Sequence, residues 1–203
     1  MRVDMPDHMP GMPDHDMIDP LPALGFIRQV QRRLQSQDTA LMRYIFNLTR
    51  GNRGEVGAIL VSKLGNGWLY LFLFPVIFLE LQERRLAGIL TAGANIAVSH
   101  SIYPWVKRRY RRIRPFHVDS SLISLLPTRD EFSFPSGHTM TLAAALMPVA
   151  YLNPGFWVPS IFMILLMAWA RVASGHHYPS DVCAGASMGG IIGLGISIFF
   201  LRA

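Results

Sequence analysis

Charged residues and cysteine are both scarce in this sequence of 203 residues. Asp, Glu, Lys and Arg make up 16% of the chain, whereas soluble domains carry about 25%. The one cysteine, Cys183, excludes an intrachain disulfide, and its apolar surroundings favour a small buried side chain. The polar, acidic and proline-rich N-terminus lacks the pattern of a secretory signal peptide. We find no strand-type alternation and no solenoid repeat, so a β-sheet or repeat fold is not expected.

Long apolar segments are abundant instead, since 51% of the residues are hydrophobic. The candidate spans are Gly67–Leu81, Leu86–Val106, His138–Leu152, Gly155–Val172 and Asp181–Leu201. The second and the last have about the 20 residues that a spanning helix needs. The first is short, and it can extend back through Val56–Leu64. Five such helices in a soluble protein would leave too little polar chain to coat them. The sequence therefore predicts an all-α, integral membrane bundle of about five spans.

The N-terminal part has a different character. Met1–Pro22 is rich in Met, Pro, Asp and His, which is typical of a disordered tail. Phe26–Leu48 has apolar residues at helical spacing with arginines between them. This pattern predicts an amphipathic basic helix, either lying on an anionic bilayer surface or packed against the bundle. Gly51–Gly67 is rich in glycine and is expected to be a hinge. The predicted domains are a tail (1–25), an interfacial helix with its hinge (26–55) and a membrane domain (56–203).

Positive charge is concentrated in one stretch, "KRRYRRIRP" (Lys107–Pro115), which holds six of the nineteen Lys and Arg residues. Such blocks bind lipid headgroups, nucleic acid or phosphate, and nucleic acid fits least beside membrane spans. If the helix continues up to Pro115, Lys107, Arg111 and Arg114 share one stripe. Lys107 and Arg114 can then converge on one polyanion. The alternative is a positive collar at the membrane edge.

A Pro-Ser-Gly-His turn, Pro135–His138, directly precedes an apolar segment. Ser136 is suited to cap the helix that follows, and Gly137 lets backbone approach a ligand closely. The unpaired N–H groups and the positive end of that helix favour an anion. His138 is then placed to give a proton to it. The alternative is a plain capped helix with an incidental histidine.

The third polar stretch is "ARVASGHHYPSDV", which ends the fourth candidate span and begins the fifth. His177 follows Arg171 by six residues, and Asp181 comes four residues later. A carboxylate near an imidazole fixes its tautomer and stabilises the imidazolium, which makes the histidine a nucleophile. His176 is adjacent and could be mistaken for the active residue.

The three stretches together resemble the signature of the type 2 phosphatidic acid phosphatase (lipid phosphate phosphatase) superfamily, which also includes vanadium haloperoxidases. The first motif of that family, Lys, six residues and Arg-Pro, is matched by Lys107–Pro115. The second, Pro-Ser-Gly-His, is matched by Pro135–His138. The resemblance extends over Leu86–Leu201 and points to the bacterial integral membrane branch.

The third family motif is Ser-Arg, five residues, His, three residues and Asp. Arg171, His177 and Asp181 match its spacing, but Ala170 replaces the leading serine, so a hydroxyl contact at that position is absent.

The resemblance implies a role for each matched residue. His177 would attack phosphorus and form a phosphohistidine, Asp181 would orient it, and His138 would protonate the leaving oxygen. The phosphoryl oxygens would be held by Lys107, Arg114, Ser136, the Gly137 amide and Arg171. Fixed cations and a helix N-terminus suit phosphoryl transfer. No carboxylate cluster of metal-ligand type accompanies these residues, so neither a metal nor another cofactor is expected.

These residues and the resemblance predict a membrane enzyme that hydrolyses a lipid phosphate monoester or diphosphate. Polyprenyl diphosphate, phosphatidic acid and phosphatidylglycerol phosphate fit equally well. One alternative is a phosphotransferase that passes the phosphoryl group to another lipid. Another is a non-catalytic membrane protein that binds anionic lipid. A vanadate-dependent peroxidase fits the spans and the small size poorly. The expected partners are the lipid phosphate and a bilayer with anionic lipids, while the sequence leaves the oligomeric state open.

The predicted location is the inner membrane of a bacterium. Five spans put all three motifs and the N-terminal segment at one face. The basic residues of Phe26–Lys63 and Lys107–Arg129 far outnumber Arg84, Arg85 and Arg202, so the positive-inside bias favours a cytoplasmic site. The resemblance points the other way, because many bacterial members of the family work on the periplasmic face.

Overall fold

The computed structural model describes residues 22–51, 53–128 and 130–202, so most of the predicted tail (1–25) lies outside the described residues. The chain divides into two compact units, Met1–Ser36 and Gln37–Ala203. Helix α1 (Pro22–Thr49) includes the predicted segment Phe26–Leu48 and contributes residues to both units. In the second unit its Met42 and Phe46 are buried in a core cluster. Residues 37–49 of this helix therefore pack against the bundle, which was one of the two alternatives for the amphipathic segment.

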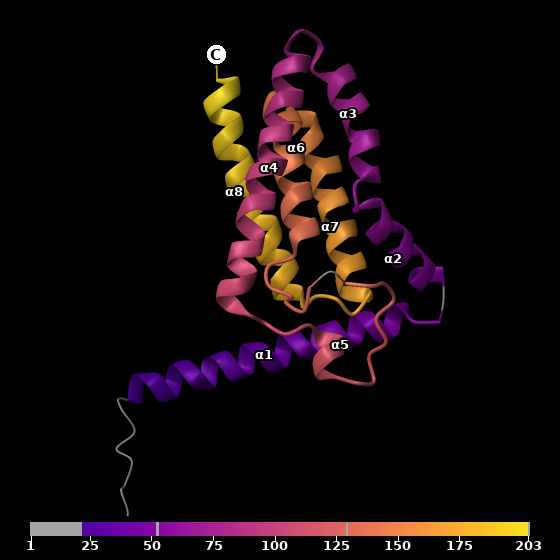
Figure 1. Ribbon diagram of the computed structural model, residues 1–203, viewed down its shortest axis with the longest axis vertical. Coiled ribbons are helices and arrows are strands. Elements are labelled where there is room, and N and C mark those ends of the chain that lie inside the picture. Colours follow the sequence, from indigo (N-terminus) through magenta and orange to yellow (C-terminus); the bar gives the residue numbers. More distant parts are fainter. Residues whose placement is uncertain (1–21, 52, 129, 203) are drawn as a thin grey trace, which may run out of the picture. The chain divides into compact units, whose positions relative to one another are not determined.

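In the described part of the chain, six further long helices follow (Figure 1). They are α2 (Arg53–Leu64), α3 (Trp68–Glu80), α4 (Arg85–Tyr110), α6 (Gly137–Leu152), α7 (Trp157–Ala173) and α8 (Pro179–Leu201). Three short helices join them: η1 (Gln82–Arg84), α5 (Pro115–Val118) and η2 (Pro154–Phe156). Each of the five predicted apolar segments corresponds to one helix, namely α3, α4, α6, α7 or α8. The bundle is all-helical as predicted, with one isolated β-bridge, between Ile113 and Phe132, in the described residues.

Helix α6 lies at the centre of the bundle, because every residue from Thr139 to Ala150 is buried. Helix α8 approaches it closely through Gly185, Gly189 and Gly193. A Cβ atom added at Gly185 would lie 2.5 Å from the Ser136 carbonyl oxygen, so only glycine permits this contact. Small residues at a helix interface allow such close backbone approach. This packing brings the first turns of α6 and α8 together at one end of the bundle.

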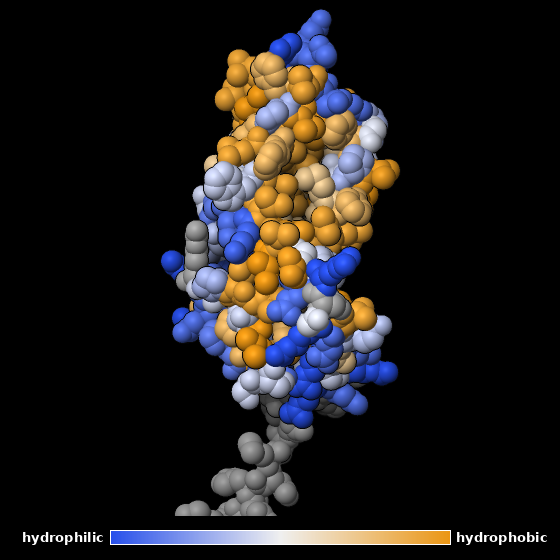
Figure 2. All heavy atoms as spheres, turned by 90° about the vertical axis from the view of Figure 1, so that its right-hand side faces the viewer, coloured by the Kyte–Doolittle hydropathy of each residue, from blue (hydrophilic) through white to orange (hydrophobic). Residues whose placement is uncertain are grey.

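Exposed apolar side chains cover the outer helices, and Figure 2 shows them as an apolar surface with hydrophilic residues gathered toward its ends. By length and composition, Pro154–Ala173 and Pro179–Leu201 can each cross a membrane. Helices α2 and α3 also qualify if they count as one broken span. In the described residues this criterion yields two or three spans, compared with the five predicted. Helix α6 has only 16 residues, and its enclosure by other helices removes the need for contact with lipid along its length.

The prediction that Cys183 is a buried side chain is wrong. This cysteine lies in the first half of α8 and is exposed. A membrane helix that is apolar on all sides packs on the bundle with one face and meets lipid with another. Apolar neighbours in the sequence therefore do not imply that a side chain is inside the protein.

The glycine-rich stretch Gly51–Gly67 was predicted to be a hinge, and this prediction is mostly wrong. Residues 53–64 form helix α2, and the chain bends by 67° between α2 and α3. The bend includes Gly67, whose φ of 128° is readily adopted only by glycine. The break is therefore confined to about one turn of chain.

The predicted continuation of the basic helix to Arg114 is also wrong. Helix α4 ends at Tyr110, and Arg111 adopts a left-handed conformation with a φ of 49°. Arg114 is extended just before Pro115, so Lys107, Arg111 and Arg114 do not share a helical stripe. Pro115 disfavours a helical conformation at the residue before it, so α4 could not extend past Arg114, but this does not prevent the helix from ending earlier.

Candidate active site

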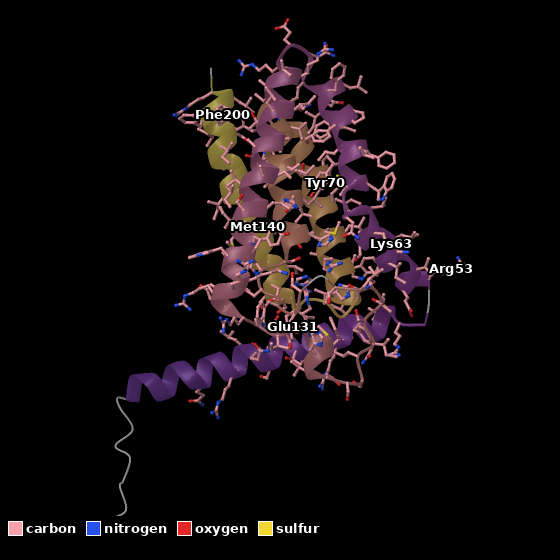
Figure 3. The ribbon with its side chains drawn as sticks, viewed as in Figure 1. Arg53, Lys63, Tyr70, Glu131, Met140 and Phe200 are labelled. Carbon is pink, nitrogen blue, oxygen red and sulfur yellow. The ribbon has the colours of Figure 1, made fainter. Side chains whose placement is uncertain are left out.

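A cavity of about 600 Å³ lies where α4 ends and α6 begins, beside the break between α2 and α3. Residues of all three predicted motifs line it: Lys107, Arg114, Gly137, His138, Arg171 and His177. Lys63 from α2 and Tyr70 from α3 line it too, and Figure 3 shows them on the same side of the bundle. Two predicted site residues, Ser136 and Asp181, are fully buried and do not line the wall. The fold thus brings three separate stretches of chain to one hollow.

Two cations of the first motif share one carboxylate. Lys107 donates from Nζ to both oxygens of Asp130, at 3.0 and 2.9 Å, and Arg114 donates from Nη2 to Oδ1 at 2.7 Å. Burial by itself would raise the pKa of Asp130, but the hydrogen bonds and charges of Lys107 and Arg114 hold that pKa below its ordinary value. The role of Asp130 was not predicted from the sequence. The available signal was an acid in the short segment between the two phosphate motifs.

The third cation, Arg171, is 6% exposed. Its Nη2 donates to Nδ1 of His176 at 2.7 Å. Its Nε is buried and has no hydrogen-bond partner among the described residues. A buried guanidinium N–H without a partner is costly, so Arg171 retains a donor for an anion in the cavity.

His177 is 1% exposed, and its two ring nitrogens have different surroundings. Its Nδ1 lies 2.8 Å from the carbonyl oxygen of Ser133, which can only accept, so Nδ1 carries the proton. Its Nε2 lies 3.3 Å from Nη1 of Arg114. Burial, followed by the charges of Arg114 and Arg171, lowers the pKa of His177 well below its ordinary value. The ring is therefore neutral, with a lone pair on Nε2 at the cation cluster.

Asp181 does not hydrogen-bond directly to His177. Its Oδ2 lies 3.8 Å from Nδ1 of His177 and instead accepts the backbone N–H of Tyr178 at 2.8 Å. Its Oδ1 pairs with Arg112 at 2.6 Å. The Nδ1–H group of His177 donates its hydrogen bond to the Ser133 carbonyl, and the Asp181 carboxylate lies next to the ring as a negative charge.

His176 is a partner of Arg171 and has a different role from His177. Its Nδ1 accepts from Arg171, and its Nε2 donates to the Leu126 carbonyl at 2.9 Å, beside the Ser124 hydroxyl. Burial, then the charges of Arg171 and Arg114, lowers the pKa of His176 to about 3. A His176 that is neutral near neutral pH can therefore hold Arg171 in place, a role that was not predicted from the sequence.

The second motif lies at the start of α6. His138 shares a hydrogen bond of 2.8 Å between its Nε2 and Oδ1 of Asn66, which belongs to the break between α2 and α3. Ser136 occupies the N-cap position but makes no capping bond with its side chain. Its hydroxyl accepts from Thr139 instead, at 2.9 Å. Asn66 was not identified from the sequence, because it lies 72 residues away from His138.

The rest of the basic block divides into two groups. Arg108, Arg109 and Arg112 were predicted to meet lipid headgroups, and Arg108 and Arg109 are exposed, as is Arg111. For Arg112 the prediction is wrong, because this side chain is turned toward the protein. Its guanidinium pairs with Asp38 and Asp181, each at 2.6 Å. Across the described ranges, no three His, Cys, Asp or Glu side chains gather in a way that could hold a metal ion.

The family model of the PAP2 superfamily matches residues 86–203. The decaprenylphosphoryl-5-phosphoribose phosphatase of Mycobacterium tuberculosis (strain H37Rv) is 38% identical over 128 residues, which cover 63% of this chain and 68% of that protein. The lipid A 1-phosphatase of Rhizobium johnstonii is 34% identical over 161 residues, covering 77% of this chain and 56% of that protein.

Among solved structures, the transmembrane PAP2 type phosphatidylglycerolphosphate phosphatase from Bacillus subtilis is similar, with a TM-score of 0.63 and 22% identity. The match covers 84% of this chain and 87% of that one. At 22% identity this similarity is evidence for a shared fold only. The helical bundle therefore has the same fold as a membrane phosphatase.

Proposed function

Because the chain belongs to the PAP2 superfamily, we propose that it is a membrane enzyme that hydrolyses a phosphate monoester or diphosphate of a lipid through a phosphohistidine on His177. One observation carries this proposal. A buried, neutral imidazole with its lone pair on Nε2 lies beside Arg114, in a cavity that Lys107 and Arg171 also line. Such a group is a nucleophile next to an anion site.

In the first step, the phosphoryl oxygens bind Lys107, Arg114 and Arg171 and the Gly137 amide at the start of α6. Nε2 of His177 attacks phosphorus, the N–P bond forms and the bond to the leaving oxygen breaks. His138 gives a proton to that oxygen. The Nδ1 proton stays on the ring, hydrogen-bonded to Ser133, and the positive ring is stabilised by the nearby Asp181 carboxylate.

In the second step, a water molecule attacks phosphorus and the N–P bond breaks. His138, now neutral, takes a proton from the water, and inorganic phosphate leaves with neutral His177 restored. Fixed cations stabilise the transferring group in both steps, which is the main requirement of phosphoryl transfer. The buried Ser136 hydroxyl, which accepts from Thr139, is the remaining proposed phosphoryl contact at the start of α6.

The substrate is a lipid whose phosphate reaches the cavity from the bilayer. Polyprenyl diphosphate, phosphatidic acid and phosphatidylglycerol phosphate remain the candidates, and the relatives' polyprenyl and lipid A substrates support a lipid of this kind. Transfer to a second lipid instead of water is the close alternative, because both acceptors attack the same intermediate. A non-catalytic, lipid-binding protein would need the cations of the cavity, but it would not need a neutral histidine with a free lone pair beside them.

The proposed topology has five spans in residues 56–203. Helices α2 and α3 together form the first span, and α4, α6, α7 and α8 form one span each. Residues 26–55 form an interfacial helix and its connection, and anionic lipids contact the exposed arginines. All three motifs lie at one membrane face of the bacterial inner membrane. The excess of basic residues at that end supports the cytoplasmic face.

The test is phosphate release from a panel of lipid phosphates by the purified full chain. We expect release from at least one of them, and none from His177→Ala. The matched control is His117→Ala, an exposed histidine that does not line the cavity. Equal activity in His177→Ala would exclude the phosphohistidine. Phosphate appearing on an added lipid alcohol, instead of in solution, would establish the phosphotransferase.

A further inference from the structure

The fully buried carboxylate of Asp181 is held by two donors. The Tyr178 N–H binds Oδ2 at 2.8 Å, and Nη1 of Arg112 binds Oδ1 at 2.6 Å. A buried carboxylate is stable only when it is paired. Arg112 therefore neutralises Asp181 and fixes the rotation of its carboxylate, which leaves Oδ2 on the side of His177.

Arg112 supports His177 by a second route, through its backbone. The Ser133 N–H donates to the Arg112 carbonyl at 2.7 Å, and the Ser133 carbonyl accepts the Nδ1 proton of His177. One residue thus holds both groups that face Nδ1. Neither contact brings Arg112 itself to the cavity, which it does not line.

Asp38 of α1 holds Arg112 in turn. Its Oδ2 pairs with Nη2 of Arg112 at 2.6 Å, and its Oδ1 accepts the backbone N–H of Ser180 at 2.9 Å. The Ser180 hydroxyl also donates to Asp38. Asp38 therefore fixes the guanidinium and satisfies an N–H in the first turn of α8, one residue before Asp181. The Arg112 guanidinium also lies 4.0 Å from the centre of the Tyr178 ring, which limits its movement.

We propose that Asp38 and Arg112 are positioning residues for His177, acting through the chain of contacts Asp38–Arg112–Asp181. This inference rests on the proposed function, in which His177 is the nucleophile. Asp38 precedes the region 86–203 that the family model matches. Helix α1 consequently belongs to the catalytic apparatus and is more than a membrane attachment.

A second ion pair on α1 provides a control. It distinguishes a positioning effect on His177 from a general loss of contact between α1 and the rest of the second unit. Arg43 pairs with Asp119 at 2.8 Å, and the two side chains are 56% and 19% exposed. This pair also joins α1 to the rest of the second unit, but it makes no contact with Asp181, Ser133 or His177. Arg43→Gln is therefore the matched control for Asp38→Asn.

The experiment compares the full-length wild type with Asp38→Asn, Arg112→Gln, the double variant and Arg43→Gln in phosphate release. We expect Arg112→Gln to lower kcat about 10-fold or more with KM nearly unchanged, as loss of a supporting contact usually does. Asp38→Asn lowers kcat less. The double variant matches Arg112→Gln alone, because the asparagine amide oxygen can still accept the Ser180 N–H and the rest of the effect of Asp38 passes through Arg112. Arg43→Gln keeps the wild-type kcat.

Spectra of the ¹⁵N-histidine-labelled proteins give a readout that does not need turnover. We expect the ring nitrogen signals of His177 to change in Asp38→Asn and Arg112→Gln, and to stay unchanged in Arg43→Gln. A wild type that is inactive on every lipid phosphate but shows this pattern would sink the proposed function and leave the positioning chain supported. Unchanged His177 signals with unchanged kcat would overturn the chain. It would also be overturned by losses that multiply in the double variant or by an equal loss in Arg43→Gln.

Discussion

Arg171 donates a hydrogen bond of 2.7 Å from Nη2 to Nδ1 of His176, and both side chains are buried. The adjacent His177 uses its own Nδ1 in the opposite sense, as a donor to Ser133. Two neighbouring histidines thus have different tautomers, and only His177 presents a lone pair to Arg114. His176 instead supports a cation of the site.

Replacing the two histidines should therefore give different defects. His177→Ala should abolish both turnover and acid-labile phosphate on the enzyme. His176→Ala should still form the phosphoenzyme, but with kcat/KM lowered about 10-fold, because Arg171 loses the partner that orients it. Trapping with labelled lipid phosphate measures both. Acid-labile phosphate that survives in His177→Ala and vanishes in His176→Ala would reverse the assignment of the nucleophile.

Lys107→Ala and Arg114→Ala should each lower turnover by about 100-fold or more, since one donor aimed at developing charge typically contributes about 100- to 1,000-fold. Arg108→Ala should retain most activity, because Arg108 is exposed and does not line the cavity. Steady-state phosphate release measures all three. Equal losses at the three positions would mean that the basic block acts only through its net charge.

Asp130→Asn should strengthen inhibition by vanadate about fivefold. Asp130 occupies donors of Lys107 and Arg114 that an oxyanion needs, and a nearby like charge costs about 1 kcal/mol when exposed to water. The control is Glu131→Gln, which removes the same charge from the next, exposed side chain. Inhibition constants for vanadate provide the comparison. No change in Asp130→Asn would indicate that the carboxylate moves away before any anion binds.

Acid should destabilise the protein through its buried histidines. The pKa of His176 is about 3 in the folded protein, against an ordinary value of 6.5, so below that ordinary value the unfolded chain binds a proton that the folded chain does not. Stability is then complete above about pH 6.5 and is lost progressively as the pH falls toward about 3. Thermal unfolding in detergent should show the midpoint falling over this window. His176→Gln should flatten the fall, and an unchanged slope in that variant would contradict the assignment.

The five-span topology predicts that Ala40 and Ser120 lie on one side of the membrane and Glu83 on the other. Single cysteines at these exposed positions, in a Cys183→Ser background, can be labelled in intact cells with an impermeant maleimide. A cytoplasmic site predicts labelling at Glu83 alone. Labelling at Ala40 and Ser120 alone would place the site on the outer face, and equal labelling of Ser120 and Glu83 would refute five spans.

The sequence was sufficient to locate the five helices, because each lies in a segment that is mostly apolar and almost free of charged residues. It also indicated that Lys107, His138 and His177 belong to one site, since each lies at the end of such a run and matches a family motif. The cavity brings these three residues together.

Features that depend on distant contacts could not be predicted. Arg112 lies 74 residues from Asp38 and 69 from Asp181, and no local pattern links them. The end of α4 depends on the left-handed conformation of Arg111, which has a residue type that does not favour it. The bend at Gly67 accompanies the packing of α2 on α7 and of α3 on α4, which are contacts between segments distant in the sequence.

The glycines of α8 also constrain the chemistry at a distance. Gly189 lies against the backbone of Met140 in the interior of the bundle, eight residues after Asp181, or about 12 Å along the helix axis. The backbones of α6 and α8 touch there without a side chain to absorb a change in size. A single added methyl group would force the two helices apart and shift His138 relative to Asp181. The absence of a side chain at Gly189, which does not line the cavity, therefore helps to set the distance between His138 and Asp181.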